Sequence, residues 1–272
     1  MVSKSEGFIE SQGVNIHYLE KNKNSVKQPT LLFVPGVMMP AWIWEKQIEY
    51  FSKNYRVVAM DPRSQGDSEQ SSEGHYAFSL AKDIKAVVDK LDLRPLVLIG
   101  WSLGVPEVVN YAAHFGSKEL KGLVLVDGLV GIDPSVPFYQ TTVEYWAQLQ
   151  SDRVPKTREF VKSMFKQPQA EEYFEKLSEV ALRTPTNTVM TLINNYILQD
   201  FRFLLQRIEI PTLITTVEGP RLDYMKKIQT LLPHARLEII QSAAHALFVD
   251  QPEVFNKLLE VFIEEIKTLK ML

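Results

Sequence analysis

Short apolar runs rich in β-branched residues recur along the sequence, and a turn signal bounds each of them. Continuous runs of this kind are typical of strands that are buried on both faces of a parallel sheet. They cover residues 30–34, 56–60, 96–99, 122–126, 211–217 and 235–240. Apolar positions with helical spacing fall between them, at residues 43–52, 80–91, 105–115, 222–232 and 252–266. This alternation, which follows a hairpin predicted over residues 8–19, predicts an α/β fold with a mostly parallel, doubly wound sheet.

The interval from about residue 134 to residue 207 interrupts this alternation. It contains several helical stretches separated by prolines, and no convincing strand. Such an interval is too long to be an unstructured connection within a compact domain. We therefore predict a helical cap inserted between two strands, so that residues 1–131 and 209–272 form an α/β core and residues 132–208 form the cap. A separate helical domain with an unrelated function is the alternative interpretation.

The composition limits the chemistry that the chain can support. Of its 272 residues, 45% are hydrophobic and 23% are charged, as in an ordinary globular protein. The chain has no cysteine, which excludes disulfides, thiolate metal sites and a cysteine nucleophile. Its formal net charge of −3 gives no sign of the basic surface that nucleic-acid binding needs. We expect a cytoplasmic protein, because the sequence shows neither a membrane-spanning apolar segment nor a secretory signal.

The sequence Gly100-Trp101-Ser102-Leu103-Gly104 matches the pattern G-x-S-x-G. It lies between a predicted strand and a predicted helix, which is the context that a nucleophile elbow requires. The flanking glycines allow a sharp turn that holds the hydroxyl of Ser102 above the sheet. The amide of Leu103, at the start of the helix, is then placed to donate a hydrogen bond to an oxyanion. We predict that Ser102 is a nucleophile; a purely structural turn is the alternative.

A serine nucleophile needs a general base near neutral pH. Among the five histidines, only His245 lies just after the last predicted strand and ahead of the final amphipathic helix. We therefore predict that His245 is the base. A surface or core role explains His17, His114 and His234 better. His75 lies in a predicted loop and could line a pocket, but we do not assign it to the site.

With these motifs, the chain resembles the α/β-hydrolase superfamily, and within it the group of esterases and cofactor-independent haloperoxidases. Residues 32–37, Leu-Phe-Val-Pro-Gly-Val, are similar to the family's His-Gly oxyanion segment, with Pro35 in place of the histidine. Residues 61–68 are similar to its D-x-R-x-x-G-x-S loop, which we interpret as architecture. The resemblance implies that the amides of Val37 and Leu103 form the oxyanion hole. It implies no metal and no organic cofactor.

The acid that would orient His245 is the least determined part of the site. The family commonly places it after the strand predicted at 211–217, but Pro220 stands where the aspartate would align. Some members carry the acid one strand earlier, where Asp127-Gly128 follows the run 122–126. An aspartate at the C-terminal end of a strand can turn toward the catalytic crevice. We predict that Asp127 is the acid, although Asp-Gly is also a common turn. The other candidates are Glu218 and Asp223.

The resemblance implies a serine hydrolase that cleaves a small or medium carboxylic ester through an acyl-enzyme. A perhydrolase or haloperoxidase-like activity at the same residues is one alternative, and a non-catalytic member that only binds a ligand is another. An aspartate nucleophile, as in haloalkane dehalogenases and epoxide hydrolases, does not fit a serine at position 102. The expected partner is a small-molecule ester. The candidate residues of the substrate pocket are Trp101, Val130, Phe138 and Trp146.

Overall fold

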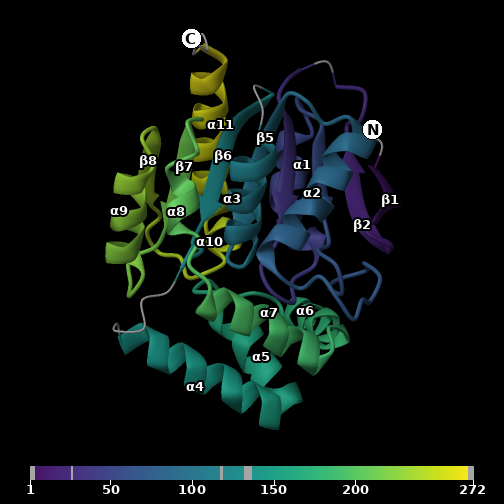
Figure 1. Cartoon of the computed structure of the whole chain (residues 1–272), viewed down its shortest axis with the longest axis vertical. Coiled ribbons are helices and arrows are strands. Elements are labelled where there is room, and N and C mark those ends of the chain that lie inside the picture. Colours follow the sequence, from purple (N-terminus) through teal and green to yellow (C-terminus); the bar gives the residue numbers. More distant parts are fainter. Residues whose placement is uncertain (1–3, 26, 117–118, 132–136, 269–272) are drawn as a thin grey trace.

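The computed structural model describes residues 4–268, except residue 26, residues 117–118 and residues 132–136. Its strands are β1 (Lys4–Ser11), β2 (Val14–Lys21), β3 (Thr30–Val34), β4 (Val57–Met60), β5 (Leu96–Trp101), β6 (Leu120–Val126), β7 (Thr212–Thr216) and β8 (Ala235–Ile239). They form one sheet with the order β1-β2-β4-β3-β5-β6-β7-β8 (Figure 1). The strands β3 to β8 pair in parallel, whereas the hairpin β1–β2 is antiparallel and joins β4 in antiparallel orientation.

Several helices pack against this sheet. They are η1 (Ala41–Trp44), α1 (Glu45–Phe51), α2 (Ala77–Leu91), α3 (Gly104–Phe115), α9 (Leu222–Leu231), α10 (Leu247–Asp250) and α11 (Pro252–Thr268). Each of the five segments with predicted helical spacing overlaps one of them. No described helix is both long enough and apolar enough to span a bilayer.

Two glycines show that helices cover both faces of the sheet. A Cβ built on Gly100 in β5 would lie 2.7 Å from a methyl group of Val108 in α3. A Cβ built on Gly122 in β6 would lie 2.9 Å from the ring of Phe262 in α11. The β5–β6 register separates the two glycines by an odd number of positions, so they point to opposite faces. Since α2 packs beside α3 and α1 packs beside α11, the predicted doubly wound sheet is confirmed.

Between β6 and β7 the chain forms further helices: α4 (Pro137–Ser151), α5 (Arg153–Ser163), α6 (Glu171–Arg183), α7 (Thr186–Leu198) and α8 (Arg202–Leu205). We call α4 to α8 the helical insertion. In Figure 1, α4 to α7 gather at the lower end of the sheet, where β6 ends. The short helix α8 contacts α3 and α9. The division of the chain into two core segments and a cap stays a prediction.

One sequence expectation about the sheet is wrong. The run 235–240 suggested a strand buried on both faces, yet none of the five residues of β8 is fully buried. The reason is that β8 is an edge strand, with a neighbour on one side only. In contrast, all five residues of the central strand β3 are buried.

Candidate active site

Ser102 lies in the turn between β5 and α3. Its φ of +55° falls in the left-handed region that residues with a side chain rarely adopt. The turn is tight, because a Cβ built on Gly100 would lie only 2.6 Å from the carbonyl oxygen of Gly104. This strained backbone keeps the Ser102 side chain clear of the helix and the sheet, and the residue is partly exposed.

His245, in the loop between β8 and α10, reaches Ser102 from the other end of the chain. Its Nε2 lies 2.9 Å from Ser102 Oγ, and its Nδ1 lies 2.6 Å from Asp127 Oδ2. A distance of 2.6 Å between a ring nitrogen and a carboxylate oxygen requires a proton between them, so Nδ1 carries the hydrogen and donates it. The lone pair of Nε2 can then accept the hydroxyl hydrogen of Ser102. The structure therefore joins the three predicted residues in one chain of hydrogen bonds.

Asp127 follows β6 directly and is 1% exposed. Its Oδ1 accepts the hydroxyl of Thr216 at 2.6 Å, and its Oδ2 accepts both His245 and Nη1 of Arg221, the latter at 2.7 Å. Burial alone would raise the pKa of Asp127, but the hydrogen bond from His245 and the charge of Arg221 outweigh burial and lower the pKa to about 2. The carboxylate is therefore ionised at neutral pH.

The two alternative acids lie elsewhere. Glu218 is on the wall of a cavity beside His245, and its carboxylate accepts a long hydrogen bond of 3.4 Å from Gln241. The side chain of Asp223, in α9, is 92% exposed and pairs with Lys226. Within the described part of the chain, neither carboxylate forms a hydrogen bond or an ion pair with His245. Of the three candidates, only Asp127 is placed to orient the imidazole.

The loop that carries His245 is anchored on two sides. The indole of Trp101 donates to the carbonyl oxygen of His245 at 2.9 Å, and the amide of Ala246 donates to the carbonyl oxygen of Met164, just after α5, at 2.8 Å. The carboxylate of Asp250 accepts amides from both this loop and the segment that follows Met164. The His245 side chain is 15% exposed. Burial, and next the charge of Arg221, lower the pKa of His245 despite the opposing effect of Asp127.

The predicted oxyanion segment passes directly beside Ser102. A Cβ built on Gly36 would lie 2.8 Å from Ser102 Cβ and 3.3 Å from its Oγ. Among the described residues, the amides of Val37 and Leu103 donate no hydrogen bond to another protein group. Two unpaired amides that flank a serine hydroxyl are suited to bind an anionic oxygen. Their role as the oxyanion hole stays a prediction.

A cavity of about 280 Å³ opens beside the pair His245–Asp127. Its other walls come from the end of α5 and from the loop after β7: Phe160, Ser163, Met164, Val217, Glu218, Gly219, Pro220 and Arg221. The predicted pocket residues Trp101, Val130 and Trp146 are buried, and these three do not line it. Phe138 belongs to α4, but its side chain lies outside the described part of the chain. The assignment of these four residues to a substrate pocket is still open.

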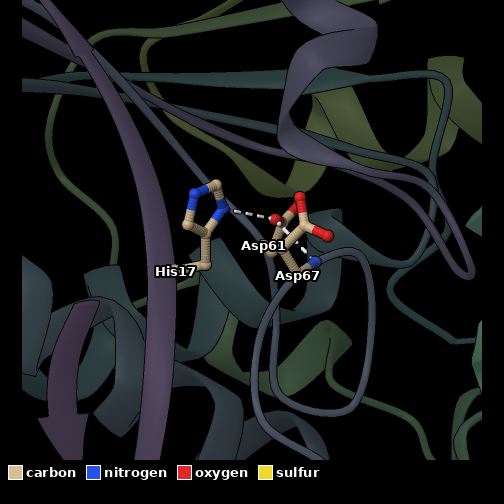
Figure 2. Close-up of side chains that lie close together, drawn as sticks. All are labelled: His17, Asp61 and Asp67. Atoms are coloured by element: carbon tan, nitrogen blue, oxygen red, sulfur yellow. Dashed lines mark hydrogen bonds and ion pairs between the residues drawn. The ribbon is translucent and has the colours of Figure 1, made fainter. Parts of the chain in front are cut away.

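A second cluster of titratable groups lies away from this site. His17, Asp61 and Asp67 bring possible metal-ligand atoms within 4.8 Å of one another (Figure 2). However, Asp61 Oδ2 accepts His17 Nδ1 at 2.7 Å and the Asp67 amide at 3.0 Å, and Oδ1 accepts the amide of Ala41. The carboxylate of Asp67 pairs with Arg183 at 2.7 Å. These bonds hold the 61–68 loop in place, which supports its interpretation as architecture.

Two residues of the site were not expected from the sequence. Thr216 is the last residue of β7, and Arg221 lies five residues later at the start of α9. No motif marks either residue. Each lies near Asp127 in space because β7 pairs with β6 in the sheet, and not because of its position in the sequence. One possible signal in the sequence was Pro220, which stands where the family usually has its catalytic aspartate and is followed directly by Arg221.

Comparison with known proteins agrees with the fold. Residues 29–252 match the model of the alpha/beta hydrolase fold family. The chain belongs to the α/β-hydrolase family. This confirms the resemblance inferred from the motifs, although the family alone does not define the reaction.

Several relatives are similar to this α/β hydrolase over much of its length. It is 27% identical to a non-heme chloroperoxidase of Streptomyces lividans, an alignment that covers 93% of this chain and 98% of the relative. It is 32% identical to the bifunctional esterase/perhydrolase DCH of Acinetobacter calcoaceticus over 125 residues, 45% of either chain. An esterase of Exiguobacterium antarcticum has a similar structure, with a TM-score of 0.85, 19% identity, and coverage of 96% of this chain and 99% of its own. At that identity the structural likeness shows the fold alone.

Proposed function

We propose that this α/β hydrolase cleaves small or medium carboxylic esters through an acyl-enzyme on Ser102. The observation that carries this proposal is the chain of hydrogen bonds in which His245 Nε2 lies 2.9 Å from Ser102 Oγ and Nδ1 lies 2.6 Å from Asp127 Oδ2. A serine hydroxyl, an imidazole in the correct tautomer and an ionised carboxylate are the parts that this chemistry needs.

In the acylation half, Ser102 Oγ attacks the carbonyl carbon of the ester while its proton passes to His245 Nε2. The electron pair of the carbonyl π bond moves to oxygen, where the amides of Val37 and Leu103 would stabilise the negative charge. When the carbonyl re-forms, the bond to the leaving oxygen breaks and His245 returns its proton to that oxygen. An alcohol leaves, and the acyl group remains on Ser102.

In the deacylation half, His245 takes a proton from water, whose oxygen attacks the acyl carbon. The second tetrahedral intermediate collapses, the bond to Ser102 Oγ breaks, and the proton on Nε2 passes to Oγ. A carboxylic acid is released, and the starting state of the site is restored. Asp127 stabilises the imidazolium in both halves and stays ionised.

A perhydrolase activity at the same residues is the second candidate, and the relative named a bifunctional esterase/perhydrolase supports it. Hydrogen peroxide would replace water as the nucleophile in deacylation, and the product would be a peracid. The test is to add hydrogen peroxide to the ester assay and measure peracid by its oxidation of bromide. Formation of a peracid that requires Ser102 would support this second activity.

The central test is covalent labelling combined with turnover. A fluorophosphonate probe should label Ser102 in the wild-type protein, and a series of p-nitrophenyl esters from acetate to long chains should be hydrolysed. The Ser102→Ala variant should lose both the label and the turnover, because it removes the hydroxyl that attacks the probe and the ester. A wild-type protein that is neither labelled nor active on any ester would instead be a ligand-binding member of the family.

A further inference from the structure

Arg221 shares its carboxylate partner with the imidazole. Its Nη1 donates to Asp127 Oδ2 at 2.7 Å, and the same nitrogen lies 2.9 Å from His245 Nδ1. Two donors, one on a guanidinium and one on an imidazole, therefore converge on a single oxygen. The side chain of Arg221 is 29% exposed and lies on the wall of the cavity beside His245.

The contact between Arg221 and His245 is not a hydrogen bond in the tautomer that the site requires. Nδ1 carries the hydrogen that is donated to Asp127, so it has no lone pair to offer. Nη1 of an arginine is always protonated and is a donor only. The 2.9 Å separation thus places a permanent positive charge against the ring that must gain a positive charge when it takes the proton of Ser102.

The charges around the imidazole come from few elements. Asp127, after β6, and Arg221, at the start of α9, are the charged groups that contact the ring in the described part of the chain. Glu218, after β7, lies on the wall of the same cavity. Asp250, in α10, is already engaged by amides of the His245 loop and of the segment after α5. Ser102 and Trp101, from β5 and the turn after it, are neutral.

We propose that Arg221 is a positioning residue that fixes Asp127 and, through its charge, opposes protonation of His245, so that the site works down to lower pH. This inference rests on the proposed function. In an arrangement without Arg221, burial alone would oppose the ionised Asp127, which favours the imidazolium. Here the guanidinium adds to this opposition while it keeps the carboxylate oriented toward Nδ1.

The consequence is a shift in the acid limb of the pH profile. His245 acts as a base only when it is unprotonated, and burial together with Arg221 lowers the pKa of this group from 6.5. Activity should therefore persist below the pH at which an ordinary histidine becomes protonated. A like charge at contact distance moves a pKa by about one unit or more, and partial exposure of Arg221 favours the lower end of that range.

The test compares the pH dependence of kcat/KM for wild type, Arg221→Met, Arg221→Gln and Arg221→Lys. We expect the acid limb of the profile to move up by about one pH unit in Arg221→Met and Arg221→Gln. At one pH unit below the new pKa, kcat/KM of these variants should be about tenfold lower than on their own plateau. Arg221→Lys keeps the charge and should retain most of the wild-type profile. The matched control is Lys226→Met, which removes one positive charge from the same helix at an exposed position and should leave the profile unchanged.

A second measurement does not depend on turnover. In the Ser102→Ala background, NMR titration of the His245 ring should show the same upward shift when Arg221 is replaced by Met or Gln. An absence of esterase activity would refute the proposed function, yet this titration would still test the effect of Arg221. The inference is overturned if His245 titrates at the same pH with and without Arg221, or if Lys226→Met produces an equal shift.

Discussion

Replacement of Asp127 by asparagine tests the hydrogen-bond chain at its most buried point. In the wild-type protein, Nδ1–H of His245 donates to the carboxylate, which leaves Nε2 free to accept from Ser102. An asparagine amide can present its NH₂ group to Nδ1, and Nη1 of Arg221 already lies 2.9 Å from that atom. Both donors favour the tautomer with its hydrogen on Nε2. In that tautomer the ring donates to Ser102 and cannot accept the hydroxyl proton.

The expected magnitude follows from the tautomer and from the burial of the carboxylate. In a Ser-His-Asp site the change costs about 10⁴-fold in kcat, or about 5 kcal/mol of transition-state stabilisation. The pKa of Asp127 falls from 3.8 to about 2 on folding, so the ionised group contributes about 2 kcal/mol to the free energy of unfolding. This contribution is fully present above pH 3.8 and is lost as the pH falls through about 2. We therefore expect Asp127→Asn to fold, with a Tm several degrees lower.

The assay measures kcat and kcat/KM for a p-nitrophenyl ester near neutral pH, with circular dichroism to verify the fold. Asp223→Asn is the matched control, since it makes the same chemical change at a side chain that is 92% exposed, and it should match wild type. An Asp127→Asn variant that keeps its kcat within about tenfold of wild type would contradict the reasoning. In that case Glu218→Gln should be measured next, because Glu218 faces the same cavity.

Two further predictions concern packing and a buried charge. Gly36→Ala would bring a Cβ within 2.8 Å of Ser102 Cβ and should lower kcat/KM by about 100-fold. Gly13→Ala strains the turn between β1 and β2, where φ is +76°, but open space surrounds its Cβ, so this variant should leave kcat/KM unchanged. Glu107 in α3 is 1% exposed, neither of its oxygens is hydrogen-bonded in the described chain, and burial, with the charge of Asp83, raises its pKa well above 4.5. The free energy of unfolding should therefore fall by about 1.4 kcal/mol per pH unit as the pH rises from 4.5 to the pKa of Glu107 in the native protein. Glu107→Gln should remove this slope. Parallel curves of Tm against pH for the two proteins would refute the prediction.

The parts of the site that were predictable from the sequence are those with a local signal. Ser102 is marked by two glycines that permit a tight turn, and His245 by its place between the last strand and the last helix. Asp127 was predictable because an aspartate at the end of a parallel strand faces the edge where the serine also lies. Each of these signals depends on residues within a few positions of the functional side chain.

Arg221 and Thr216 could not be found in this way, because their role comes from tertiary structure. They meet Asp127 because β7 lies next to β6, although the helical insertion separates the two strands in the sequence. The exposure of β8 was missed for a related reason. An apolar run indicates a strand but does not say whether that strand lies in the middle or at the edge of its sheet.

The bond between the amide of Ala246 and the carbonyl oxygen of Met164 links the helical insertion to the residue beside the imidazole. Substitutions that shift the end of α5 would therefore also strain the backbone next to His245, even where they lie far from it in the chain. Evolution of a new specificity through this helix must preserve the backbone at Met164, or compensate for its displacement. An insertion transplanted from a relative would therefore need this contact rebuilt to keep the His245 loop in place.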